Sequence, residues 1–84
     1  MAIVVVTPEA FEQAERLPVP IRGRVHRILL RLEHWPEVSG AKPLSGKLAG
    51  RYRIRTGDYR LQFRVVGDRV VVERIGHRSG FYDQ

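Results

Sequence analysis

Apolar residues in the first part of the chain follow one strand-like run and two helix-like spacings. Met1 to Val6 is rich in β-branched residues and predicts a buried strand. Thr7 precedes Pro8, a pair that favours a helix start, because a threonine hydroxyl caps free backbone N–H groups and proline fits the first turn. Prolines end this helix, and a second helix is expected from about Val19. The apolar helix faces are expected to be Phe11, Ala14 and Leu17, and then Val25, Ile28, Leu29 and Leu32.

Alternation of polar and apolar residues replaces the helical spacing in the second half of the chain. A Pro- and Gly-rich loop is expected over residues 36–50, and Gly57 with Asp58 and Gly67 with Asp68 supply turn residues further on. Strands are expected at about 51–56, 59–66 and 69–76. The order β-α-α-β-β-β predicts an α+β fold, a single domain over residues 1–84. In it a two-helix hairpin packs on one face of a mainly antiparallel four-stranded sheet.

Arginines gather on one face of this expected sheet. Neighbouring strand residues point to opposite faces, so Tyr52, Ile54 and Leu61 are expected beneath the helices. The open face is then expected to carry Arg51, Arg53 and Arg55 from one strand and Arg60, Gln62 and Arg64 from the next. Alternation leaves the faces of the last strand undecided, because apolar residues stand there at consecutive positions. Trp35, after the second helix, is expected to cover the core rather than to stack on a base.

The distribution of charge bears on this face. Residues 1–42 hold six basic and five acidic side chains, whereas residues 43–84 hold nine and four, so most of the formal charge of +6 belongs to the second half. Glu73 is the only acid within the three expected strands, and a row of arginines without acidic partners repels itself. A solvated polar face is the ordinary alternative. The imbalance favours a polyanionic partner such as RNA.

Other classes of function are disfavoured by what the sequence lacks. No cysteine is present, so neither disulfides nor thiolate metal sites are expected, and the reducing cytoplasm is the expected location. The longest apolar run, Ile3 to Val6, is too short for a signal peptide or a membrane span. Gly40 and Gly46 enclose five residues, not the four of a phosphate-binding loop, and Leu48 replaces the required Ser or Thr. We therefore expect no membrane partner, no metal and no cofactor.

The residues after the last strand have chemistry suited to a phosphodiester. His77 and Arg78 come at the end of the strand, and Tyr82 stands close behind them. Taken singly, each is more commonly a surface or packing residue. At the edge of an arginine-rich face, however, a titratable imidazole, a fixed cation and an aromatic hydroxyl together form the set that RNA cleavage requires.

Two stretches resemble a known protein family. KPLSGKLAGRYRIRTGDYRLQF and VVVERIGHRSGFYD, within residues 42–83, are similar to the RelE/ParE superfamily of bacterial toxins from type II toxin-antitoxin systems, and most similar to its RelE-like branch. The resemblance implies a fold of the microbial RNase type and cleavage of messenger RNA in the ribosomal A site. It also implies neutralisation by a cognate antitoxin from a neighbouring gene.

The resemblance implies roles for individual residues as well. The positions that match catalytic residues of the family are Arg60, His77, Arg78 and Tyr82. The positions expected to bind RNA are Arg51, Arg53, Arg55, Arg64 and Arg74. The family pattern has lysines at Arg53 and Arg55, and a guanidinium does not accept a proton, so His77 is expected to act as general base or acid. The spacing from Arg78 to Tyr82 is also shorter than in the family pattern.

The reaction implied by the resemblance is attack of the RNA's own 2′-OH on the adjacent phosphodiester, which needs no metal. A ParE-like inhibitor of DNA gyrase and an RNA-binding relative without catalysis are the alternatives. The expected partners are messenger RNA on the ribosome and the antitoxin. An extended or helical segment of the antitoxin is expected to cover the basic face and the helical hairpin.

Overall fold

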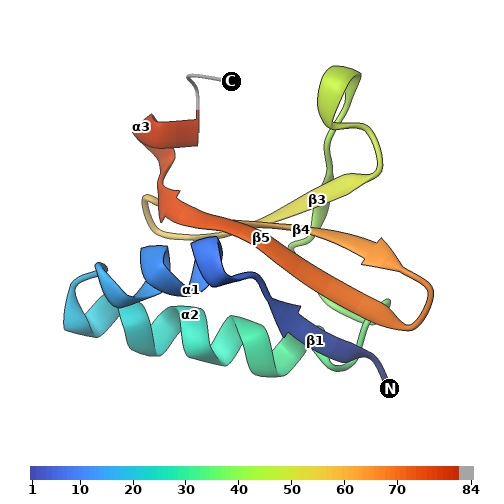
Figure 1. Cartoon of the computed structure of the whole chain (residues 1–84), viewed down its shortest axis with the longest axis horizontal. Helices are drawn as coiled ribbons and strands as arrows, with labels where there is room; N and C mark the ends of the chain where they lie inside the picture. Colours follow the sequence, from blue (N-terminus) through green and yellow to red (C-terminus); the bar gives the residue numbers. More distant parts are fainter. Residues whose placement is uncertain (82–84) are drawn as a thin grey trace.

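A computed structural model describes residues 1–81 of the chain. Within these residues, helices α1 (Pro8–Glu15) and α2 (Val19–Leu32) lie on one face of a five-stranded sheet, as Figure 1 shows. The strands are β1 (Ile3–Val6), β2 (Lys42–Pro43), β3 (Arg51–Thr56), β4 (Tyr59–Val66) and β5 (Arg69–His77), in the spatial order β1-β5-β4-β3-β2. A 3-10 turn, η1 (Gly46–Leu48), and a short helix, α3 (Arg78–Phe81), lie on the opposite side of the sheet. The expected α+β fold is confirmed.

The two edge strands differ from the expectation. β2 lies inside the segment expected to be a loop and adds a fifth strand to the described sheet, because two residues are too few to show alternation. β1 pairs in parallel with β5 and forms the other edge of the sheet. Ile3 is therefore 50% exposed, and the expectation of a buried first strand is wrong.

Two-residue turns set the register of β3, β4 and β5. Gly57 and Gly67 each stand first in their turn, with φ angles of 60° and 61°, and an aspartate follows each of them. A first residue with positive φ and a second with negative φ is the type II′ arrangement, whose twist matches that of a hairpin. Ile54 consequently lies opposite Leu61, and both are buried beneath the helices as alternation predicts.

The helices cover the sheet with the expected apolar faces, except at one residue. The Thr7 hydroxyl accepts a hydrogen bond from the backbone N–H of Ala10 at 3.1 Å and caps α1, as expected. Ala10 is fully buried, whereas Phe11, which was expected to point inward, is 56% exposed. The inward stripe contains Ala10, Ala14 and Leu17, and Phe11 lies about 100° around the helix from Ala10. In α2, Val25, Ile28 and Leu32 are buried and Leu29 is half-buried.

A β-bulge in β5 decides which of its residues face the helices. Gln62 pairs with Arg74 while Phe63 pairs with Val72, so Glu73 is an extra residue without a partner in the ladder. The extra residue shifts the alternation by one position. The core residues of β5 are Val70, Val72 and Ile75.

Trp35 covers one end of the core. Its ring centroid lies 4.8 Å from that of Tyr52 and 5.3 Å from that of Phe63, both in edge-to-face geometry. Tyr52 and Phe63 stack on each other at 5.5 Å, and Phe63 is fully buried. The expectation that Trp35 is a packing residue is confirmed.

Candidate functional site

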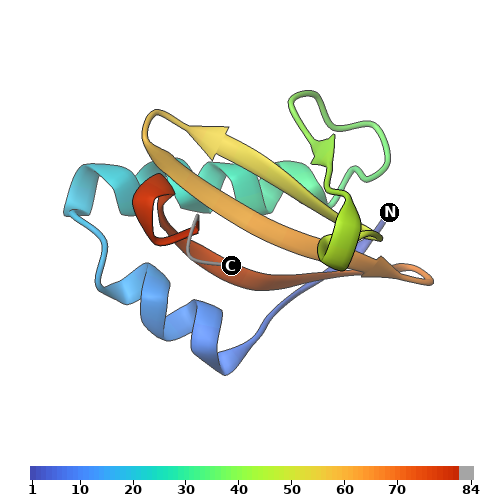
Figure 2. The ribbon, with the colours of Figure 1, turned by 90° about the horizontal axis from the view of Figure 1, so that it is seen from above.

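Cross-strand pairing arranges polar residues of β3, β4 and β5 in three rows on the sheet face opposite α1 and α2. We call this surface the arginine face. The first row is Arg55, Arg60 and Gly76, the second is Arg53, Gln62 and Arg74, and the third is Arg51 and Arg64 with Glu73 beside them. Since two residues advance a strand by about 6.6 Å, the outer rows lie about 13 Å apart. α3 stands at the end near the first row, and the segment with η1 rises near the third (Figures 1 and 2).

The first row combines an enclosed and an exposed guanidinium. Arg60 is only 8% exposed, whereas Arg55, directly opposite on β3, is exposed to solvent. A charge held away from water acts more strongly on a nearby phosphate than a solvated charge does. Gly76, the neighbour of Arg60 on β5, adds no side chain to this row. This row is therefore the part of the face best suited to stabilise developing negative charge.

The third row is built around a carboxylate. The Nε of Arg51 lies 2.7 Å from one oxygen of Glu73, and the Nε of Arg64 lies 2.9 Å from the other oxygen. The side chain of Glu73 is 22% exposed, so this bridge is partly shielded from water. The expectation of a row without acidic partners is therefore wrong at this end of the face.

In the second row, Arg74 anchors α3. Its Nη2 donates a hydrogen bond to the carbonyl of Gly80 at 2.7 Å. Arg53 in the same row is half-buried, and Lys42 of β2 lies opposite it and extends the row toward the edge of the sheet. The basic surface thus reaches across four strands of the described sheet, from β2 to β5.

Arg78 is held at the end of the first row by the β3–β4 turn. Its backbone N–H donates to the carbonyl of Asp58 at 2.7 Å, and its Nε lies 3.7 Å from the carboxylate of the same residue. Both side chains are more than half exposed, at 59% and 66%, so this ion pair is weak. The main chain of Arg78 is therefore anchored, and its exposed guanidinium can exchange Asp58 for a phosphate at little cost.

His77 lies at the end of β5 on the other side of the sheet from Arg60. It pairs with Tyr59, and the two rings meet edge to face at 5.3 Å, so His77 shares the side of Leu61 and Ile75. The backbone N–H of Ser79 donates to Nδ1 of His77 at 3.2 Å. The hydroxyl of Ser79 lies 2.9 Å from the same nitrogen, so Ser79 holds the ring of His77 at Nδ1 through two groups.

A small cavity connects His77 with the arginine face. It has a volume of about 190 Å³ and lies between α1, the edge of β5 and α3. Its lining residues are Gln13, Arg74, Ile75, Gly76, His77 and Gly80. The side-chain oxygen of Gln13 accepts a hydrogen bond from the backbone N–H of Ile75 at 2.8 Å, which satisfies the edge of β5 beyond the end of β1. The cavity brings Arg74 and His77 to one polar hollow.

Two contributors were missed from the sequence, and one matched residue is not described. Glu73 was noted only as an isolated acid, although the consecutive polar residues Glu73 and Arg74 interrupt the alternation and signal a bulge. Gln13 carried no local signal, because its partner Ile75 is distant in the sequence. Tyr82 lies outside the described residues.

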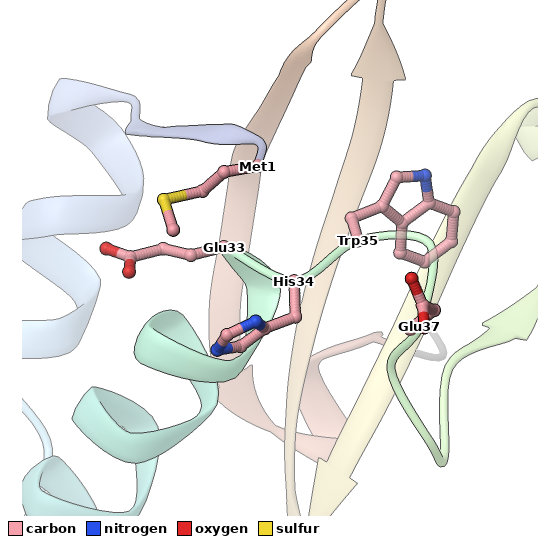
Figure 3. A pocket seen from close by; sticks show the side chains of 5 residues that line it. All are labelled: Met1, Glu33, His34, Trp35 and Glu37. Atoms are coloured by element: carbon pink, nitrogen blue, oxygen red, sulfur yellow. The ribbon is translucent and has the colours of Figure 1, made fainter.

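A second cavity lies away from the arginine face. It has a volume of about 470 Å³ and is lined by Met1, Glu33, His34, Trp35 and Glu37. Figure 3 shows the side chains of Glu33, His34 and Glu37 pointing in different directions. Among residues 1–81, no group of three or more His, Asp or Glu side chains is arranged to hold a metal ion. No helix within the same residues is long and apolar enough to cross a membrane.

Comparison with known proteins identifies relatives of the whole fold. The family described as ParE toxin of type II toxin-antitoxin system, parDE, matches residues 4–82. Toxin RelE3 of Methanocaldococcus jannaschii is 32% identical over 72 residues, which are 82% of this chain and 82% of that protein.

Solved structures of toxin-antitoxin complexes contain the same fold. A chain of the RelBE2 complex from Mycobacterium tuberculosis has a TM-score of 0.79 and 30% identity, with 92% of this chain and 98% of that chain covered. A chain of the RelB-RelE complex from Methanococcus jannaschii has a TM-score of 0.79 and 26% identity, with 94% and 95% covered. The isolated RelE toxin of E. coli, at 20% identity and a TM-score of 0.76, shares the fold over 99% of this chain and 93% of that one. The chain belongs to the RelE/ParE superfamily of toxins from type II toxin-antitoxin systems.

Proposed function

We propose that this toxin inhibits translation by cleaving messenger RNA on the ribosome through attack of the substrate's 2′-OH, with no metal required. The observation that carries the proposal is the first row of the arginine face. There an enclosed Arg60, the side-chain-free Gly76 and the backbone-anchored Arg78 follow one another at the end of the sheet. Toxin RelE3 and the RelBE2 complex supply the family context.

Cleavage by an internal 2′-OH sets three tasks: removal of the 2′ proton, stabilisation of the phosphorane, and protonation of the leaving 5′ oxygen. Arg60 and Arg78 are proposed to stabilise the phosphorane, because both are fixed cations at the same end of the face. Their positions support this role, since the loss of water around Arg60 strengthens its interaction with a phosphate.

His77 is proposed to serve the proton transfer as general base or general acid. Its exposed ring is held by Ser79 at Nδ1, which leaves Nε2 for the substrate. The substrate would pass over Gly76 to contact both Arg60 and His77. Tyr82 is proposed to stack on or orient the base at the cleavage point.

The remaining arginines are proposed to hold the RNA backbone. Arg55 belongs to the first row, Arg53 and Arg74 lie in the second, and Arg51 with Arg64 forms the far end. A guanidinium suits this task because its planar fork donates to two phosphate oxygens at once. An antitoxin is the second proposed partner, since RelBE2 and RelB-RelE are complexes of a toxin with its antitoxin.

The proposal is tested by in vitro translation with purified protein, followed by primer extension on the message. We expect cuts within codons at the A site. Arg78→Ala is expected to lower the cleavage rate about 100-fold or more, the usual effect of losing one group that stabilises a charged transition state. Arg27→Ala removes an exposed arginine from α2 on the opposite layer and should leave the rate unchanged.

Message that stays intact in the presence of the wild-type protein would contradict the proposal. Equal rates for Arg78→Ala and the wild type would remove Arg78 from the catalytic set while leaving the reaction in place.

Inhibition of DNA gyrase is the second candidate, favoured by the family match, whose description is that of the ParE toxin. The position of His77 beside Tyr59, rather than beside Arg60, is compatible with a surface that binds without cleaving. A gyrase supercoiling assay on the same preparation separates the two. Loss of supercoiling with intact message would favour the second candidate, and salt-sensitive RNA binding without either effect would favour an RNA-binding relative without catalysis.

A further inference from the structure

Glu73 has no assigned role, although it is the acid at the centre of the third row. It is the extra residue of the bulge, and the bulge turns its side chain toward the arginine face. Both of its oxygens are used, one by Arg51 and one by Arg64. An acid placed on an RNA-binding face repels phosphate, so its presence there requires an explanation.

The geometry of the bridge leaves the arginines able to bind a second anion. In both ion pairs the contact to Glu73 is made by Nε. A guanidinium carries five N–H donors in one plane, so most donors of Arg51 and Arg64 remain for another partner. The side chains are 33% and 46% exposed, which keeps the guanidinium groups within reach of a ligand from solvent.

The bridge also reduces the freedom of both side chains. A free arginine loses rotamer entropy when it is fixed on a phosphate. Glu73 fixes two arginines from neighbouring strands on one carboxylate before any ligand arrives. Binding by groups that are already fixed loses less entropy.

We propose that Glu73 is a positioning residue that holds Arg51 and Arg64 as a preformed clamp for one phosphodiester of single-stranded RNA. The clamp lies about 13 Å from the first row, two rows along the strands. The clamp rests on the proposed function in one respect, because it requires RNA to be the ligand of the arginine face. The clamp fixes the RNA backbone at a distance from the scissile phosphate and so sets the position of the strand along the sheet.

Removal of Glu73 is predicted to change RNA affinity in the direction opposite to that expected from net charge alone. Removal of Glu73 raises the formal net charge from +6 to +7, and attraction between charges alone would then tighten RNA binding. Loss of a preformed clamp weakens it instead. Asp68→Asn provides a matched control, because Asp68 is an exposed acid in the adjacent β4–β5 turn and its removal changes the net charge equally.

The experiment measures binding of a short fluorescent 2′-O-methyl RNA, which lacks the attacking hydroxyl, to the full-length toxin at several salt concentrations. Glu73→Ala is expected to weaken binding about threefold to tenfold relative to Asp68→Asn, as expected for side chains that must be ordered anew. The salt dependence should become less steep by about 0.7 logarithmic units for each phosphate contact that is lost. A residue with a merely structural role would leave this slope unchanged.

Binding by Glu73→Ala that equals or exceeds that of Asp68→Asn would overturn the inference. If Glu73→Ala does not fold, as judged by circular dichroism, Glu73→Gln decides by the same comparison, because it keeps the shape and one strong acceptor. Cleavage of messages is assayed in parallel with the wild type. If Glu73→Ala weakens binding and the wild type cleaves no message, the clamp is supported and the proposed function is contradicted. If the wild type cleaves messages and Glu73→Ala binds RNA as well as the control, the proposed function is supported and the clamp is contradicted.

Discussion

The arginines of the arginine face differ in their surroundings and therefore in what they can contribute. Arg60 is enclosed, Arg51 shares a carboxylate with Arg64, and Arg78 is held mainly through its backbone. The enclosed guanidinium of Arg60 interacts most strongly with a nearby charge, and the bridged side chains of Arg51 and Arg64 have the least conformational freedom. Arg78 releases its partner, Asp58, most easily, because that ion pair is exposed to water. At the scale of one residue, burial and neighbours thus separate side chains of identical chemistry.

Trp35 gives a prediction about stability at the residue scale. Its edge-to-face contacts with Tyr52 and Phe63 close one end of the core. Trp35→Ala is expected to lower the free energy of unfolding by about 2–4 kcal/mol, somewhat less than for a fully buried tryptophan, since Trp35 is half-buried. Urea unfolding followed by circular dichroism measures the loss. Trp35→Phe, which keeps an aromatic ring, should lose less, and equal losses would contradict the role of ring packing.

At the scale of elements, β5 holds the molecule together. It lies between β1 and β4, accepts a hydrogen bond from Thr7 N–H at the carbonyl of Val72, and receives the side chain of Gln13 from α1. Its hairpin with β4 depends on the turn at Gly67. The register of the three long strands, and with it the order of the arginine rows, therefore depends on two turn glycines.

Exchanging glycine for alanine at two positions should have opposite effects. Gly67 has a φ of 61° and nothing within 4 Å of an added Cβ, so Gly67→Ala adds only backbone strain and should destabilise by about 1–2 kcal/mol. Gly23 lies inside α2 with the same open space and without positive φ, and Gly23→Ala should stabilise by about 0.5–1 kcal/mol. Thermal unfolding of the two variants measures both changes. Shifts of the same sign would contradict the assignment of the turn.

Some elements of the fold could be predicted from the sequence, and others could not. Alternation and turn glycines located β3 and β4 at their observed bounds, because local chemistry determines both. β2, the edge position of β1 and the outward direction of Phe11 depend on distant pairing and were not predictable from local pattern. The same holds for the site. The arginines of β3 and β4 were placed on the open face from the sequence, whereas the Glu73 bridge and the side taken by His77 required the register across the bulge.

At the scale of the whole molecule, the two outer surfaces differ in character. One is the arginine face, and the other is the helical layer, where Phe11, Val19 and Leu30 are 56%, 69% and 51% exposed. A groove of about 180 Å³ lies between α1 and α2, lined mainly by apolar side chains that include Phe11 and Leu29. The proposed antitoxin would cover both surfaces, with acidic residues on the first and apolar residues on the second.

Two variants are expected to separate these contacts. Phe11→Asp should weaken the complex with the product of the adjacent gene at least about tenfold by removing an exposed apolar anchor, and should leave RNA binding unchanged. The double change Arg53→Gln with Arg55→Gln should weaken both. Co-purification and titration of the complex measure the first effect, and the RNA assay measures the second. No complex with the wild-type toxin would remove the proposed partner.

The bulge divides β5 into two parts, and the side chains of each part alternate between the two faces of the sheet independently. Before Glu73, pairing with β1 determines which residues face the helices. After Glu73, the pairing of Gln62 with Arg74 determines it. Without the bulge, Glu73 would pair with Gln62 and the downstream half would turn over, bringing Ile75 to the arginine face and Arg74 toward the core. Because the insertion uncouples the halves, the part of the strand that secures folding and the part that presents Gly76 and His77 can change their patterns separately. A related chain that lacks the extra residue would present the same surface by unbroken alternation of polar and apolar residues.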